Sequence, residues 1–95
     1  MVNIFVTEER IATGKRNDCW ACPVALAINS VLKPGYVANV DTDLIEIHAG
    51  DYTGVAIVTP DRIVDFISQF DLDYTMEPEV FRINIPAEYL RADLC

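Results

Sequence analysis

The sequence lacks the marks of several large classes of protein. No apolar run reaches the roughly 18 residues that a membrane-spanning helix needs, so we expect no transmembrane segment. The first ten residues, MVNIFVTEER, have no basic start and only a short apolar stretch, unlike a secretory signal, so we expect a cytoplasmic protein. A Gly-rich phosphate loop and the H-E-x-x-H and G-x-S-x-G motifs are also absent. We therefore expect no cofactor, and no common catalytic motif indicates an enzyme.

Positive charge is scarce and unevenly distributed. Seven Lys and Arg residues stand against fifteen Asp and Glu, a net charge of −8, and residues 41–79 hold ten acids but one base, Arg62. Such a field repels phosphate, so we expect no direct binding to nucleic acid or to an anionic membrane. The acids are scattered singly, which favours an ordinary solvated surface. The alternative is an acidic decoy for a basic groove on a nucleic-acid enzyme.

Length and composition are those of one small globular domain. Of the 95 residues, 52% are hydrophobic and 23% are charged, which excludes a disordered or low-complexity protein. We find no internal repeat and no linker. One domain spanning residues 1–95 is therefore expected.

The first part of the chain predicts a strand, a helical turn and a buried helix. Alternating apolar residues predict a strand over 2–6, and Thr7 is a suitable cap for one short helical turn. A helix at about 22–32 begins with Pro23 at its first position and ends at a Pro-Gly pair. Apolar residues circle most of this helix, so it must be buried on more than one side. Because one sheet covers a single side, the second helix, the N-terminal segment or another chain, as in a homodimer, must cover the rest.

The remaining chain predicts a hairpin, two further strands and a second helix. Short β-prone runs at 36–40 and 44–48 flank an Asp-rich turn, and a third run covers 55–58. Thr59 as cap and Pro60 as first residue predict the start of an amphipathic helix at about 60–70. Alternation over 80–85 predicts a half-exposed strand, followed by a last helical turn over 87–94.

These elements follow one another in the order β-α-β-β-β-α-β. That order predicts an α+β domain with a mainly antiparallel sheet of four to five strands. The two helices, at about 22–32 and 60–70, are expected to pack on one face of that sheet.

The segment Asn17-Asp18-Cys19-Trp20-Ala21-Cys22-Pro23 is the one stretch with a chemical signature. It places a C-x-x-C pair at a helix start, where the helix dipole lowers the pKa of a thiol. One interpretation is a redox-active dithiol. A second is part of a metal site, but zinc needs four ligands and only His48 and Cys95 remain, so we expect no metal. The interpretation that we favour is structural: both cysteines are reduced packing residues, because free Cys is among the most buried residue types.

A further chemical interpretation comes from a resemblance. The residues Asp18-Cys19-Trp20-Ala21, at the opening of an apolar helix, resemble the start of the papain-like cysteine proteases. The resemblance implies that Cys19 is the nucleophile, His48 the base and Asp65 the orienting acid.

A broader resemblance covers residues 1–90. It rests on Asp18-Cys19-Trp20-Ala21-Cys22-Pro23-Val24-Ala25-Leu26-Ala27, the acidic hairpin, Thr59-Pro60, Phe66-Ile67-Ser68-Gln69-Phe70-Asp71, and Glu77-Pro78 before Phe81-Arg82-Ile83. In that order, these pieces resemble a group of small bacteriophage and bacterial proteins with a D-C-x-x-C-P-[VI]-A-L-A signature. The group implies no particular chemistry. A phage origin is consistent with a small domain that binds and diverts a host protein.

The sequence therefore predicts a non-catalytic, acidic protein-binding domain, such as a phage-encoded modulator or inhibitor of a host enzyme or defence complex. We expect its contact surface on the acidic hairpin and the flanks of that hairpin, with two exposed tyrosines as anchors. The candidate residues are Tyr36, Asp41, Asp43, Glu46, Asp51 and Tyr52. The alternative is a thiol enzyme or redox switch that uses Cys19 and Cys22, with His48 as the candidate base.

Overall fold

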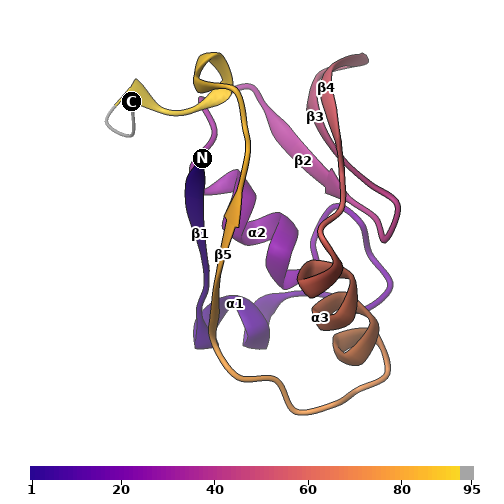
Figure 1. Cartoon of the computed structure of the whole chain (residues 1–95). Helices are drawn as coiled ribbons and strands as arrows, with labels where there is room; N and C mark the ends of the chain where they lie inside the picture. Colours follow the sequence, from indigo (N-terminus) through magenta and orange to yellow (C-terminus); the bar gives the residue numbers. More distant parts are fainter. Residues whose placement is uncertain (93–95) are drawn as a thin grey trace.

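The computed structural model describes residues 1–92, and Figure 1 traces its elements along the chain. The strands are β1 (Val2–Val6), β2 (Val37–Val40), β3 (Leu44–Ala49), β4 (Tyr52–Val58) and β5 (Glu79–Ile83). The helices are α1 (Glu8–Thr13), α2 (Pro23–Asn29) and α3 (Asp61–Asp71), followed later by a 3-10 turn, η1 (Ala87–Tyr89). The end of the predicted turn over 87–94 lies outside the described residues. Within residues 1–92, no helix has the length and apolar character needed to cross a membrane.

The five strands form two antiparallel sheets. β1 pairs with β5, and Ile4 lies opposite Phe81. β2, β3 and β4 form a meander in chain order. In Figure 1 the β1–β5 pair lies on the left and the meander on the right, with α2 between them.

The predicted α+β class is confirmed, with antiparallel strands and helices close to the expected positions. The arrangement differs in one respect, because the strands divide into two sheets and α2 lies between them instead of on one face of a single sheet. The physical reason is the apolar circumference of α2. A helix that is apolar nearly all round needs cover on opposite sides, and two small sheets supply it.

Most of the helix α2 is buried by its own chain. It contacts β1, β2 and α1, and five of its seven residues are buried. Val24, Ala25, Ala27 and Ile28 have no exposed surface, and they belong to one continuous core cluster. Most of the apolar surface that the sequence left unassigned is therefore covered by the same chain.

The meander presents one face to the core and the other to solvent. On the inner face, Ile45 of β3 lies opposite Ile57 of β4, and Ile47 lies opposite Val55. Glu46 and His48 alternate with these residues and belong to the outer face. The register shifts after Ile47, which leaves Gly54 as an extra residue in β4.

The helix α3 is amphipathic, as its spacing predicts. Its buried residues are Ile63, Phe66, Ile67 and Phe70. Phe66 packs edge-on against Phe81 of β5, with ring centroids 5.7 Å apart. This contact joins α3 to the β1–β5 sheet.

The start of α3 differs from the predicted one. The helix begins at Asp61, with Pro60 in the cap position and no side-chain cap. Thr59 is buried, and its hydroxyl donates to the backbone carbonyl of Asp41 at 2.6 Å. The threonine hydroxyl therefore links the start of α3 to the β2–β3 turn by a hydrogen bond and does not cap the helix.

Candidate functional site

The cysteine segment forms a compact loop before α2. The Lys15 amide donates to the Ala21 carbonyl at 2.8 Å, which closes the loop. Inside it, one carboxylate oxygen of Asp18 accepts from the amides of Trp20 and Ala21 at 2.9 and 3.2 Å. Asp18 therefore caps backbone amides, as expected for an aspartate before a helix.

The loop is fixed to two other elements. The Asn17 amide donates to the Asp71 carboxylate at 2.9 Å, at the end of α3. The Val40 amide of β2 donates to the Cys19 carbonyl at 2.8 Å. Arg16 adds a bond from its Nε to the Phe70 carbonyl at 3.2 Å and an ion pair with Asp73. Because it is held from both sides, the loop has a defined place between α3 and the meander.

A pocket of about 210 Å³ lies where the cysteine loop, α3 and the β2–β3 turn meet. Two thiols, three carboxylates and four other side chains line it. They are Asn17, Asp18, Cys19, Cys22, Val40, Asp41, Thr42, Ile67 and Asp71. The pocket is acidic, and it contains no basic side chain that would lower the pKa of a thiol.

Cys22 is a packing residue at the start of α2. It is 3% exposed, and its Sγ accepts a hydrogen bond from the Ala25 amide at 3.4 Å as the helix cap. Burial raises the pKa of the Cys22 thiol. The structure therefore places this residue in the role that we favoured, a reduced cysteine in the core.

Cys19 is partly exposed at the pocket. Its pKa is raised, first by burial and then by the negative charges of Asp41, Asp18 and Asp71. The sequence suggested the opposite direction, because a helix start lowers the pKa of a thiol. Here burial and the nearby carboxylates raise the pKa of the Cys19 thiol instead, and α2 is a short helix of seven residues. Near neutral pH the thiol stays protonated, which is the unreactive form.

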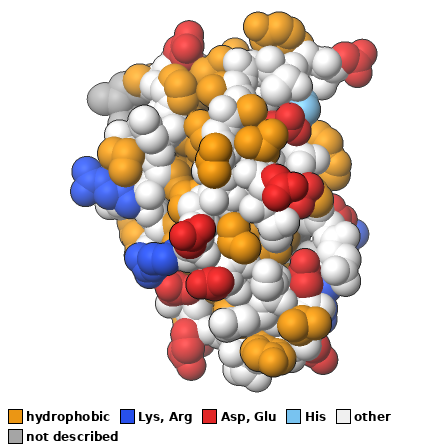
Figure 2. Space-filling model, turned by 45° about the vertical axis from the view of Figure 1, so that its right-hand side comes forward, with side chains coloured by type: hydrophobic (Ala, Val, Ile, Leu, Met, Phe, Trp, Pro, Cys, Tyr) orange, Lys and Arg blue, Asp and Glu red, His pale blue; other side chains and the backbone are white. Residues whose placement is uncertain are grey.

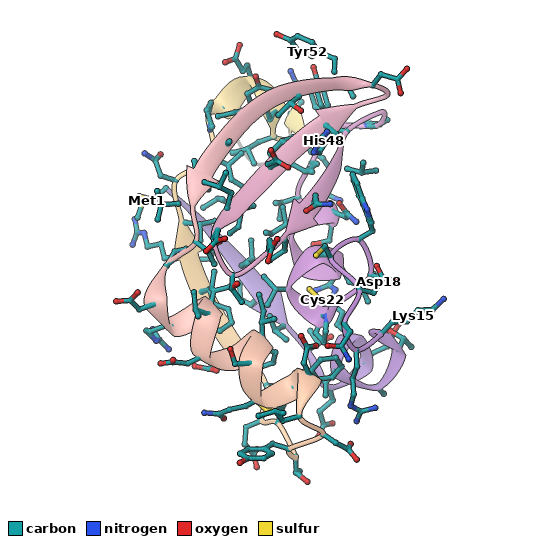
Figure 3. The ribbon with its side chains drawn as sticks, turned by 90° about the vertical axis from the view of Figure 1, so that its right-hand side faces the viewer. Met1, Lys15, Asp18, Cys22, His48 and Tyr52 are labelled. Atoms are coloured by element: carbon teal, nitrogen blue, oxygen red, sulfur yellow. The ribbon has the colours of Figure 1, made fainter. Side chains whose placement is uncertain are left out.

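His48 has partners of its own, away from the cysteines. Its Nε2 lies 3.4 Å from a Glu46 carboxylate oxygen, and its Nδ1 lies 3.3 Å from the Thr53 hydroxyl. Its ring also contacts that of Trp20, with centroids 5.2 Å apart. His48 is not among the residues that line the pocket. Figure 3 shows Asp18 beside Cys22 at the start of α2, whereas His48 lies on the β3–β4 hairpin, toward Tyr52.

The triad that the papain resemblance implies is not assembled. Cys19 lies at the pocket, His48 lies on the outer face of the meander, and Asp65 lies on the exposed face of α3. Within residues 1–92, no three His, Cys, Asp or Glu side chains are grouped so that they could hold a metal ion. Cys95, the remaining sulfur considered for a metal site, lies outside the described residues.

The acidic residues predicted to bind a partner do not form one compact patch. Asp41 and Asp43 lie at the β2–β3 turn, whereas Asp51 and Tyr52 lie at the other end of β3. A strand of that length spans about 20 Å. Glu46 lies between the two ends, on the outer face.

The two predicted anchors differ in exposure. Tyr52 is 69% exposed, as expected. Tyr36 is half-buried, because its ring packs edge-on against Tyr89 with centroids 5.3 Å apart. That contact joins residues more than fifty positions apart, so no local pattern indicates it.

The sequence analysis missed the apolar side chains of the outer face. Val37, Leu44 and Val58 are exposed there, and Trp20 is 49% exposed and lies against His48. Figure 2 shows acidic side chains interspersed with hydrophobic ones on this side of the molecule. The alternation along β3 was the available signal, since it assigns Leu44, Glu46 and His48 to one face.

Comparison with known proteins gives no family for this chain. No family model, no curated protein and no solved structure matches it. The resemblance to the phage and bacterial group therefore stays a prediction, and the function is inferred from geometry and charge.

Proposed function

We propose that this protein is a non-catalytic, acidic protein-binding domain, and that its contact surface is the outer face of the β2–β3–β4 meander. The observation that carries the proposal is a solvent-exposed sheet face on which apolar side chains surround Glu46, with Asp41 and Asp43 in the turn at its border. Val58 is 78% exposed, Val37 44% and Leu44 41%. Exposed apolar area rimmed by polar groups is typical of a protein-interaction surface.

The charge of this face indicates the chemistry of the partner. Asp41, Asp43 and Glu46 lie on it or at its border, and Arg62, the one base within residues 41–79, is paired with Glu79 at 2.9 Å. A basic partner surface is complementary to such a face, and long-range attraction would speed association at low salt. A phage-encoded modulator that occupies a basic surface of a host enzyme fits this chemistry.

The compartment that suits the proposal is the cytoplasm. Cys19 and Cys22 are both free thiols, and only two residues lie between them in the chain. Thiols stay reduced in the cytosol, whereas disulfides form in oxidising compartments. Reduced cysteines that serve as cap and packing residues agree with a cytoplasmic location.

A thiol enzyme or redox switch is the second candidate. The observation that favours it is the pocket beside Cys19, which gives a small molecule access to one sulfur. Against it, burial and three carboxylates raise the pKa of that thiol, and the only histidine has other partners. A protonated thiol without a base is a poor nucleophile.

Charge reversal on the outer face tests the proposal. Asp43→Lys with Glu46→Lys replaces two negative charges on the face with two positive ones, a net change of +4, and leaves the buried core unchanged. The matched control is Glu8→Lys with Glu9→Lys on α1, which makes the same charge change at exposed positions elsewhere. Partners captured from a lysate are purified, and their affinities for each protein are measured.

The proposal predicts that the outer-face variant loses a partner that the control retains. Removing complementary charge and adding repulsion is expected to weaken binding about tenfold or more. Equal affinity of every captured partner for wild type, variant and control would show that this face does not take part in binding.

A further inference from the structure

The two edge strands of the meander, β2 and β4, differ in whether their outward backbone groups are hydrogen-bonded. In an antiparallel sheet, alternate residues of an edge strand direct both backbone groups outward. The Asp41 amide donates to the Leu44 carbonyl at 2.9 Å, so the outward amides of β2 are those of Ala38 and Val40. Asn29 Oδ1 accepts from Ala38 at 2.7 Å, and the Cys19 carbonyl accepts from Val40 at 2.8 Å. Both outward amides of β2 are therefore paired within its own chain.

The edge of β4 is open. The Thr59 amide donates to the Asp43 carbonyl at 3.1 Å, so the amides and carbonyls of Ala56 and Val58 point away from β3. Among residues 1–92, β3 is the only strand that pairs with β4. The bulge at Gly54, where an added Cβ would lie 2.7 Å from the Tyr89 ring, limits the open edge to Val55–Val58.

Beyond the Gly54 bulge, this edge lacks the features that usually protect one. Natural edge strands carry charges, prolines or covering loops, because unpaired amides and carbonyls recruit other strands. β4 has the sequence Tyr-Thr-Gly-Val-Ala-Ile-Val, which contains neither charge nor proline. Ala56 and Val58 are exposed both at the edge and on the outer face.

We propose that the edge of β4 is a docking site for an extended, Lys- or Arg-bearing segment of a partner protein, which adds to the meander as a fourth strand. This inference rests on the proposed function and names the chemistry of its partner. Strand addition uses backbone hydrogen bonds for affinity and side-chain contacts for specificity. Here Ala56 and Val58 supply the backbone groups.

Acidic side chains around the edge select a basic segment. Asp51 precedes β4 and Asp61 follows it, while Glu46 lies opposite Ala56 on the neighbouring strand. An added strand lies about 5 Å from β4 and about 10 Å from β3, within reach of a long basic side chain passing over a small alanine. A second copy of this chain would instead bring a net charge of −8 against −8. Charge complementarity therefore favours a basic partner over self-association.

A defined peptide tests the inference on the full chain. The probe is a capped nine-residue peptide of alternating lysine and threonine, and the control probe replaces every lysine with glutamate. NMR of the labelled protein reports amide shifts and hydrogen exchange at each residue. We expect the lysine peptide to slow exchange at Ala56 and Val58, and the glutamate peptide to leave both amides unchanged.

Two variants separate backbone pairing from charge. Ala56→Pro removes an outward amide at a position where edge strands tolerate proline. Ala56→Lys keeps the amide and adds repulsion, so it tests the site even if the proline variant does not fold. Asn3→Lys, on the exposed face of β1, is the matched charge control. We expect affinity for the lysine peptide to fall about tenfold in both Ala56 variants and to stay within about twofold in the control.

Several results would overturn the inference. They are absence of protection at Ala56 and Val58, equal binding of the glutamate peptide, and concentration-dependent protection of these amides without peptide, which would identify a second copy as the occupant. Failure here is distinguishable from failure of the proposed function. If charge reversal at Asp43 and Glu46 abolishes partner binding while the Ala56 variants bind that partner normally, the outer face binds protein and the edge does not.

Discussion

The backbone amide of Val40 donates a hydrogen bond to the carbonyl oxygen of Cys19, at a distance of 2.8 Å. This bond joins the cysteine loop to the outward edge of β2. Together with the bond from Ala38 to Asn29, it leaves β4 as the open edge of the meander in the described chain. The C-x-x-C segment therefore has a structural task, which is to close one side of a sheet.

Asn29→Ala is expected to destabilise the fold and reopen the edge of β2. The substitution removes the acceptor for the Ala38 amide, at 2.7 Å, and leaves a buried donor without a partner. An unsatisfied buried group costs about 1–3 kcal/mol. Urea unfolding measures the loss, and faster amide exchange at Ala38 locates it. Asn29→Asp keeps an oxygen acceptor and is the control; an equal loss in both variants would contradict the assigned bond.

Truncation of α2 tests its place between the two sheets. Ile28→Ala removes a side chain without exposed surface, and we expect a loss of about 2–5 kcal/mol in the free energy of unfolding. Leu26→Ala, at a partly exposed position on the same helix, is the matched control and is expected to cost less. Equal losses in urea unfolding would show that α2 is not covered on both sides.

The buried thiol predicts an alkaline loss of stability. Burial raises the pKa of Cys22 in the folded state, so folding favours the protonated thiol. Its contribution is complete below the pKa of the unfolded chain and is lost as pH rises through the raised folded value. Unfolding free energies are measured from neutral pH to above the ordinary thiol pKa of about 8.5. Wild type is expected to lose more stability over this range than Cys22→Ala, and parallel curves would contradict the burial argument.

Local sequence patterns predicted most of the elements. The 3.6-residue spacing of Ile63, Phe66, Ile67 and Phe70 located α3, and two-residue alternation located β1 and β5. Their division into two sheets was not predictable, because it depends on which strands cover which side of α2. The apolar circumference of that helix showed that it must be buried on several sides, but it did not identify the strands that bury it.

The candidate site was predictable only in part. The structural role of Cys22 followed from its place before Pro23, and the structure agrees. The half-burial of Tyr36 against Tyr89, the bond from Thr59 to the Asp41 carbonyl, and the raised pKa of Cys19 all depend on residues distant in sequence. Local propensity carries no information about such contacts.

Thiol labelling of Cys19 across pH tests whether the role of the cysteine segment is non-catalytic. The Cys22→Ala variant retains two thiols, those of Cys19 and Cys95. Mass spectrometry of peptides then assigns a labelling rate to each of them. We expect a labelling midpoint above the ordinary thiol value, unchanged by His48→Ala, because burial and three carboxylates oppose ionisation. A midpoint below that value, moved upward by His48→Ala, would show a thiolate activated by the histidine and would rule out a purely structural role for Cys19.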